Sequence, residues 1–187
     1  VNIAIDFGTT SCAVAYMKNG KPKILKNRNG NYKTPSIISI NKGKILIGDD
    51  AKNYWNNEPT QSIYSIKRYL GKKRNDAPFS LSSYQFVTEG KQIAIKLDNS
   101  KFFLEDLAAK ILKSLLDDIH RAGLTPNYIV ASIPANYGHN ERKSLVQAFQ
   151  KIGVEDIHLI NEPTAAAIHY GQNQSEEELI FLILDIG

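Results

Sequence analysis

Short apolar stretches separated by glycine-containing turns dominate the start of the chain. Residues 3–7 form an apolar run interrupted by one acid, and residues 12–17 alternate in polarity. Such runs are typical of strands that bury one or both faces. The Asn19-Gly20 pair favours a two-residue hairpin turn, because both residue types accept positive φ angles. We therefore expect strands at 3–7, 12–17 and 23–26.

Residues 36–101 show shorter and less regular patterns. The expected strands in this part lie at 37–40, 45–47, 84–88 and 93–97, each beside a turn that contains glycine. A short helix is expected at 51–57, where it stops before Pro59. We interpret the whole segment as a smaller α+β subdomain, a satellite inserted into the first core.

Helical periodicity becomes clear only after residue 102. Seven apolar residues between Leu104 and Ile119 recur at spacings of three and four, which gives a helix one apolar face. Further strands are expected at 128–133 and 157–160, and further helices at 140–152 and 163–170. This order predicts an α/β fold with a mixed sheet, whose core consists of residues 1–35 and 102–175.

The sequence contains one pattern twice. Residues 3–8 and 182–187 are both apolar runs that end in an acid, an apolar residue and a glycine. In open α/β sheets such an acid lies at the carboxyl end of a strand, where ligands bind, and the glycine lets the backbone approach a phosphate. We expect residues 176–187 to be a linker and the first strand of a second lobe, and the chain to be part of a larger protein.

Composition narrows the possible partners. The chain has 187 residues and a net charge of +4, from 23 basic and 19 acidic side chains that are mostly scattered. A nucleic-acid interface usually has a continuous basic stripe, so no nucleic-acid partner is expected. No apolar run approaches the roughly 20 residues of a membrane span, so no membrane partner is expected either. The single cysteine, Cys12, excludes an intrachain disulfide and favours a cytoplasmic location.

Five segments resemble sequence blocks of the 70-kilodalton heat-shock chaperones, in the family's order and across the whole chain. They are IDFGTT at 5–10, KTPS at 33–36, IKRYLG at 66–71, SIPA at 132–135 and NEPTAAA at 161–167. SIYSIKR at 62–68, with YQF at 84–86, is most similar to the bacterial branch that serves iron–sulfur cluster assembly (HscA-like). The resemblance implies an actin-like, ribonuclease-H-like ATPase with two lobes, of which this chain holds the first.

The resemblance also implies a nucleotide site built by the two repeated turns. Gly8, Thr9, Thr10 and Gly187 would bind the phosphates of ATP or ADP, with Thr9 also acting in catalysis. Asp6 and Asp185 would hold Mg²⁺, mainly through water, and help to bind K⁺; both count among the catalytic residues. A hydrated Mg²⁺ ion usually meets one or two carboxylates together with phosphate oxygens, which suits this pair.

Lys67 and Glu162 complete the implied catalytic set. Lys67 resembles the family's essential lysine, whose ammonium stabilises charge at the γ-phosphate and orients the attacking water. Composition alone would predict that Lys67 is an ordinary solvated charge. Glu162 precedes a helix, where the helix dipole alone favours an acid; the resemblance implies that it positions water and metal. Pro134 and Arg142 resemble the pair that couples nucleotide state to peptide binding. Gly138 follows Tyr137 where the family often has phenylalanine.

The expected function is that of the N-terminal lobe of an ATP-hydrolysing chaperone. Its partners would be a J-domain co-chaperone and, through a C-terminal domain outside this chain, a client peptide or an iron–sulfur scaffold protein. Because half of the phosphate site is missing, we expect the 187 residues alone to be inactive. Two alternatives are an actin-like small-molecule kinase and a non-hydrolysing interaction module related to the chaperones.

Overall fold

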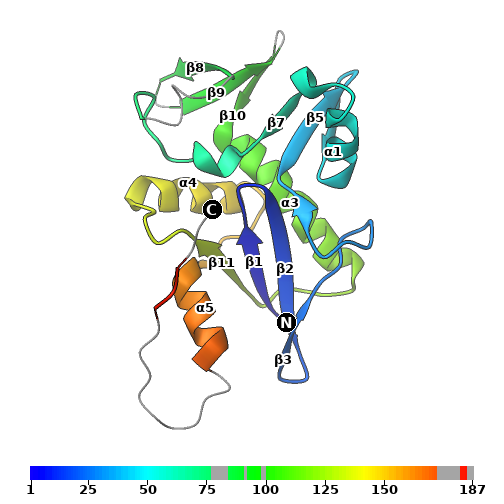
Figure 1. The fold of residues 1–187 in the computed structure, drawn as a ribbon, viewed down its shortest axis with the longest axis vertical. Helices are drawn as coiled ribbons and strands as arrows, with labels where there is room; N and C mark the ends of the chain where they lie inside the picture. The colour runs from blue at the N-terminus through cyan, green and yellow to red at the C-terminus, as the bar shows by residue number, and fades with distance from the viewer. Residues whose placement is uncertain (77–83, 91, 98–99, 172–181, 185–187) are drawn as a thin grey trace.

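A computed structural model describes residues 1–76, 84–90, 92–97, 100–171 and 182–184. Among these residues the main sheet has the strand order β12-β11-β1-β2-β3, and β4 also pairs with β2 (Figure 1). Its strands are β1 (Asn2–Phe7), β2 (Ser11–Lys18), β3 (Lys21–Ile24), β4 (Thr34–Pro35), β11 (Tyr128–Ile133) and β12 (Ile157–Asn161). Strands β1, β11 and β12 are parallel, whereas β2 runs antiparallel to its neighbours. The predicted α/β fold with a mixed sheet is confirmed.

Two smaller three-stranded sheets lie beyond the main sheet. One has the order β6-β5-β7, with β5 at Ile37–Asn41, β6 at Lys44–Ile47 and β7 at Ser62–Tyr64. The other has the order β10-β9-β8, with β8 at Gln85–Glu89, β9 at Gln92–Leu97 and β10 at Ser100–Phe103. All their strands come from residues 37–103, and the division into a core and a satellite stays a prediction.

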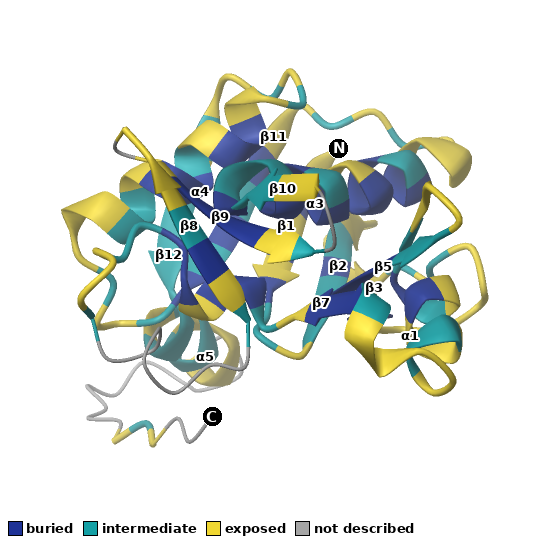
Figure 2. Cartoon of the chain, turned by 90° about the horizontal axis from the view of Figure 1, so that it is seen from above, coloured by how far each residue is buried: buried dark blue, intermediate teal, exposed yellow. Residues whose placement is uncertain are grey.

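Helices α3 (Leu104–Arg121) and α4 (His139–Gln150) lie between the main sheet and the smaller sheets (Figure 1). Helix α3 contacts α4 and strands of both smaller sheets, while α5 (Glu162–Gly171) contacts β11 and β12. The periodic apolar side chains of α3 are buried, as predicted (Figure 2). They form one hydrophobic cluster with Ile3, Ile5 and Phe7 of β1 and with Leu145 and Phe149 of α4.

Strand β1 buries only one face. Ile3, Ile5 and Phe7 are at most 2% exposed, whereas the alternate residues, including Asp6, are exposed. Successive side chains of a strand point to opposite faces. The acid that interrupts the apolar run therefore projects from the face of the sheet opposite to the core.

Several elements differ from the prediction. Helix α1 spans Asp49–Trp55 and begins two residues early, after Gly48 with a φ of 68°. Residues 62–68, for which no element was predicted, form β7 and the 3₁₀ turn η2 (Ile66–Arg68), which are separated at Ser65 by its left-handed conformation. Strand β10 was not predicted, since its sequence lacks the alternation of a half-buried strand.

The linker and strand expected within residues 176–187 lie mostly outside the described residues. Only residues 182–184 of this segment are described, and they belong to no helix or strand. A strand is stabilised by its neighbours, and the expected neighbours belong to the second lobe. In the described part of the chain, no helix is both long and apolar enough to cross a membrane.

Truncation of the α3 core should cost substantial stability. Ile111→Ala removes a side chain that is 0% exposed, so we expect the free energy of unfolding to fall by about 2 to 5 kcal/mol. Ile24→Ala is the matched control, because Ile24 is 55% exposed. Urea unfolding measures both variants; equal losses would contradict the assignment of α3 to the core.

The buried thiol of Cys12 gives a prediction for alkaline pH. Burial raises the pKa of this thiol from 9.0 to about 11, because the thiolate loses its hydration. The folded state therefore keeps a proton that the unfolded state releases, and stability falls as pH rises from 9 to 11. We expect this fall to be smaller in Cys12→Ala, as measured by urea unfolding across that range. Parallel curves for the two proteins would refute the prediction.

Candidate functional site

The parallel strands β1, β11 and β12 end at one edge of the main sheet. The register pairs Asp6 with Ser132, and Ile133 with Asn161, so the carboxyl ends of the three strands lie side by side. Ser132 Oγ donates a hydrogen bond of 2.8 Å to Asp6 Oδ1. This contact fixes the carboxylate of Asp6 at the edge where open α/β sheets bind their ligands.

The turn that joins β1 to β2 contains the predicted phosphate-binding residues Gly8, Thr9 and Thr10. A Cβ atom on Gly8 would lie 2.1 Å from the carbonyl oxygen of Ser11, so only glycine fits. Ser36, just after β4, fixes the turn from one side. The Oγ of Ser36 donates to the carbonyl oxygen of Gly8 at 2.7 Å. Its backbone N–H donates to the carbonyl oxygen of Thr10 at 2.9 Å. The backbone of the turn is therefore held in one shape.

Lys67 reaches this edge from the satellite. It lies in η2, is 5% exposed, and its Nζ is 2.7 Å from Oε1 of Glu162, the first residue of α5. A buried ammonium is costly unless it is paired, so the ion pair stabilises the position of Lys67. Two residues separated by 95 positions in the sequence are thereby brought into direct contact.

Tyr137 connects this ion pair to the predicted coupling residues. Its hydroxyl donates to the carbonyl oxygen of Lys67 at 3.0 Å, and the Nζ of Lys67 lies 6.0 Å from the ring centroid. The backbone N–H of Tyr137 donates to the carbonyl oxygen of Pro134 at 3.1 Å. Arg142 Nε donates to the carbonyl oxygen of Tyr137 at 3.1 Å, and its Nη2 donates to Asn161 Oδ1 at 3.0 Å. Tyr137 thus connects both Pro134 and Arg142 to Lys67 through hydrogen bonds.

Electrostatics keeps Tyr137 a hydrogen-bond donor. Burial raises the pKa of its phenol well above the usual range, and the nearby carboxylates of Glu141 and Glu162 raise it further. A tyrosine with the ordinary pKa of 10.0 is already protonated at neutral pH, and the raised pKa keeps Tyr137 a donor to Lys67 at more alkaline pH as well.

The structure brings together most of the predicted site. Asp6 and Glu162 lie at the same sheet edge, and Lys67 contacts Glu162. Asp185 and Gly187 lie outside the described residues. The contributions of Tyr137 and Ser132 were not predicted. Ser132 lies inside the SIPA motif and Tyr137 follows it, but the contact of Ser132 depends on strand register and that of Tyr137 on the folding of the satellite.

The donor set at the edge suits a hydrated Mg²⁺ ion. No cluster of three or more metal-ligating side chains occurs among the residues described, and the predicted ligand Asp6 stands on an exposed face. Mg²⁺ keeps several waters and typically uses one or two carboxylates with phosphate oxygens. Asp6 fits that mode of binding, in which the nucleotide supplies the other oxygens.

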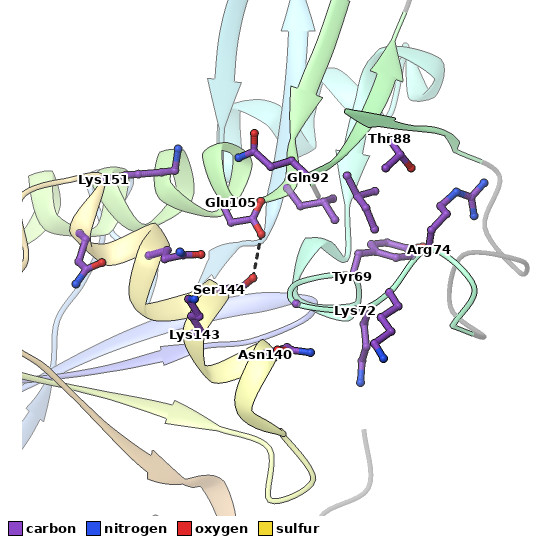
Figure 3. Close-up of a pocket in the computed structure, with 16 residues that line it drawn as sticks. Tyr69, Lys72, Arg74, Thr88, Gln92, Glu105, Asn140, Lys143, Ser144 and Lys151 are labelled. Carbon is purple, nitrogen blue, oxygen red and sulfur yellow. Dashed lines mark hydrogen bonds between the residues drawn. The ribbon is translucent and has the colours of Figure 1, made fainter. Parts of the chain in front are cut away.

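A separate cavity of about 1050 Å³ lies between α4 and the β8–β10 sheet (Figure 3). Its lining includes Lys72, Glu105, Lys143 and Ser144, and contains none of the predicted site residues. Ser144 Oγ donates to Glu105 Oε1 at 2.9 Å, and Lys72 pairs with Glu141 at 2.6 Å. The predicted site is the open sheet edge rather than this cavity.

Comparisons with known proteins agree with this geometry. The family model described as "Hsp70 protein" matches residues 2–187. The chain is 34% identical to a "Chaperone protein dnaK" of Emiliania huxleyi and 32% identical to one of Guillardia theta, over 99% of this chain and 30% of each relative. It is 35% identical to "Heat shock 70 kDa protein 6, chloroplastic" of Arabidopsis thaliana, over 99% of this chain and 27% of that protein.

The chain thus spans less than a third of the length of these curated relatives. The match covers the strand edge, the β1–β2 turn, Lys67 and Glu162 alike. By its sequence, the chain belongs to the Hsp70 family, within the actin-like ATPase domain.

Proposed function

We propose that this chain is the first lobe of an ATP-hydrolysing molecular chaperone whose nucleotide state controls peptide binding. The observation that carries the proposal is the 2.7 Å pair of Lys67 and Glu162 at the carboxyl edge of the parallel strands. Phosphoryl transfer to water requires mainly positioning and neutralisation of charge, which this arrangement provides.

The roles follow from the chemistry of each group. Gly8, Thr9 and Thr10 hold the phosphates of ATP or ADP through backbone N–H and hydroxyl donors. Asp6 holds Mg²⁺ through water and contributes to a K⁺ site, and the bound cations neutralise phosphate charge. Gly187 and Asp185 supply the matching contacts from the second lobe. Together the two turns grip one triphosphate.

Lys67 is suited to act on the γ-phosphate and the attacking water. An ammonium has three N–H donors, and the bond to Glu162 uses one of them. The other two are available to a phosphate oxygen and to a water molecule. Glu162 keeps the side chain of Lys67 aimed at the edge and accepts a hydrogen bond from the same water.

Tyr137 makes the coupling role of Pro134 and Arg142 physically plausible. Any shift of Lys67 on binding of the γ-phosphate moves its carbonyl group, which Tyr137 contacts. Tyr137 in turn holds Pro134 and Arg142 through its backbone. The state of the nucleotide is thereby passed to a peptide-binding domain through hinge motion.

The proposal extends to the biological partners of the full-length protein. We propose a J-domain co-chaperone and, on the strength of the SIYSIKR segment, a client from iron–sulfur protein maturation in the cytoplasm. The Arabidopsis thaliana relative, by contrast, is named as a chloroplastic protein. Stimulation of ATP hydrolysis by an iron–sulfur scaffold protein, compared with an unrelated peptide, tests the assignment of the client.

Two other functions were considered. A small-molecule kinase is not favoured, since the Hsp70 match extends over residues 2–187. A non-hydrolysing interaction module differs from our proposal only in chemistry, so the decisive measurement is turnover of ATP by the full-length protein.

Lys67→Ala in the full-length protein should abolish hydrolysis but not nucleotide binding. We expect kcat to fall by about 100-fold to 1000-fold, because a donor that stabilises developing charge is lost. The dissociation constant for ATP should change by less than about threefold, since the turns still hold the phosphates. Single-turnover hydrolysis and titration calorimetry measure the two quantities.

Arg68→Ala is the matched control, because Arg68 follows Lys67 in the same 3₁₀ turn and is exposed. It should retain normal hydrolysis. A Lys67→Ala protein that hydrolyses ATP at the normal rate would overturn the proposed mechanism.

The 187-residue chain by itself should bind ATP weakly and hydrolyse it poorly. These residues span 30% of the length of the Emiliania huxleyi relative, and in our proposal half of the phosphate contacts come from the second lobe. Titration calorimetry on this chain should give a dissociation constant well above micromolar. Sub-micromolar affinity would show that one lobe is sufficient, contrary to the proposal.

A further inference from the structure

An asparagine-rich turn lies between β3 and β4. The turn (residues 27–31) has the sequence Asn-Arg-Asn-Gly-Asn. Asn27 Oδ1 accepts hydrogen bonds from the backbone N–H groups of Asn29 and Asn31, both at 3.0 Å. Gly30 has a φ of 81°, a conformation that favours glycine. The backbone of the turn is thus organised around the amide of Asn27.

One carboxylate gathers all three asparagine side chains of this turn. Asp49 Oδ2 accepts from Asn27 Nδ2 at 2.7 Å and from Asn29 Nδ2 at 3.3 Å, and Asp49 Oδ1 accepts from Asn31 Nδ2 at 3.2 Å. Hydrogen bonds to an ionised acceptor are stronger than those between neutral groups. Asp49 opens α1 of the satellite, so it ties the satellite to a turn of the main sheet.

Arg28 anchors the same turn to α3. Its Nε donates to Asp118 Oδ1 at 2.9 Å, and its Nη2 donates to the carbonyl oxygen of Ser114 at 2.9 Å. The Asp118 side chain is 4% exposed, and removal of Arg28 would leave its carboxylate buried without this partner. The turn is therefore held by two carboxylates that belong to two different helices.

The turn leads directly to the wall of the phosphate-binding turn. Asn27 Nδ2 also donates to Thr34 Oγ1 at 3.2 Å. Thr34 belongs to β4 and pairs with Cys12 of β2. Ser36 follows β4 and binds the carbonyl oxygens of Gly8 and Thr10. Hydrogen bonds therefore run from Asp49 through Asn27 to Thr34, the backbone of β4 continues from Thr34 to Ser36, and Ser36 binds the turn at 8–10.

We infer that Asp49 is a positioning residue for the phosphate-binding turn: it holds turn 27–31, and thereby Ser36, in the place where Gly8 and Thr10 are fixed. The inference rests on the proposed function, because it assigns consequences to phosphate binding. Asp49 does not touch the nucleotide. It acts through the polar contacts of β4, and nothing in the sequence motifs of the site includes it.

An alternative explanation of Asp49 is the helix dipole. An acid in the first turn of a helix is favoured by the partial positive charge at that end. Asp50 occupies the next position of the same turn and is exposed. Comparison of Asp49→Asn with Asp50→Asn therefore separates the contacts to the asparagines from the dipole effect, at the same change of charge.

The experiment measures ATP and adenosine binding by the full-length protein. Asp49→Asn removes the negative charge and replaces one of the two acceptor oxygens by an N–H donor, so the three asparagine side chains lose part of their common acceptor. We expect ATP affinity to fall about tenfold, because misplacement of a binding loop weakens the contacts that it makes. Adenosine carries no phosphate, so its affinity should stay unchanged. Asp50→Asn should behave as the unmodified protein with both ligands.

A double variant tests whether the contact itself matters. Asp49→Asn with Asn29→Asp restores one carboxylate among the amides, with donor and acceptor exchanged. We expect it to recover at least half of the lost ATP affinity on a logarithmic scale. A merely destabilised protein would show no such recovery, and it would lose affinity for adenosine as well.

The outcomes separate this inference from the proposed function. Unchanged ATP affinity in Asp49→Asn, or equal losses for ATP and adenosine, overturns the positioning role of Asp49. If Lys67→Ala abolishes hydrolysis in the same protein, the proposed function stands even so. If Lys67→Ala hydrolyses ATP normally, it is the proposed function that fails.

Discussion

The ion pair between Lys67 and Glu162 is the contact on which the functional arrangement depends. Lys67 belongs to the satellite and Glu162 to the helix that follows the last strand of the main sheet. Lys67 is buried, and without Glu162 its charge would be unpaired, which costs several kcal/mol. The pair therefore favours one particular place for the satellite on the sheet edge, and the bond from the Tyr137 hydroxyl to the carbonyl oxygen of Lys67 strengthens that placement.

Strongly periodic elements could be predicted from the sequence, and elements defined by pairing partners could not. The apolar face of α3 and the runs of β1 and β11 are properties of local sequence, and they were predicted within two residues. Strand β10 is defined by its pairing with β9, and the sequence carries no separate signal for that contact. The separation of β7 from η2 occurs at the positive φ of Ser65, a conformation rare outside glycine, asparagine and aspartate.

The site shows the same contrast. The acid at the end of the first apolar run identified Asp6 as a candidate, whereas Lys67 and Glu162 were identified by their resemblance to the family's sequence blocks. Neither signal identified Ser132 or Ser36, whose roles arise from parallel register and from β4 lying against β2. A serine has no chemical signature of its own, and its contribution becomes visible only when its neighbours in space are known.

The central position of α3 has a consequence for how the molecule denatures. Its apolar side chains join the same cluster as side chains of the main sheet, and the helix also contacts strands of both smaller sheets. No sheet retains its hydrophobic support once this helix is displaced. Because one helix supports all three sheets, we expect the satellite and the core to melt as a single cooperative unit, although the chain passes from one to the other and back.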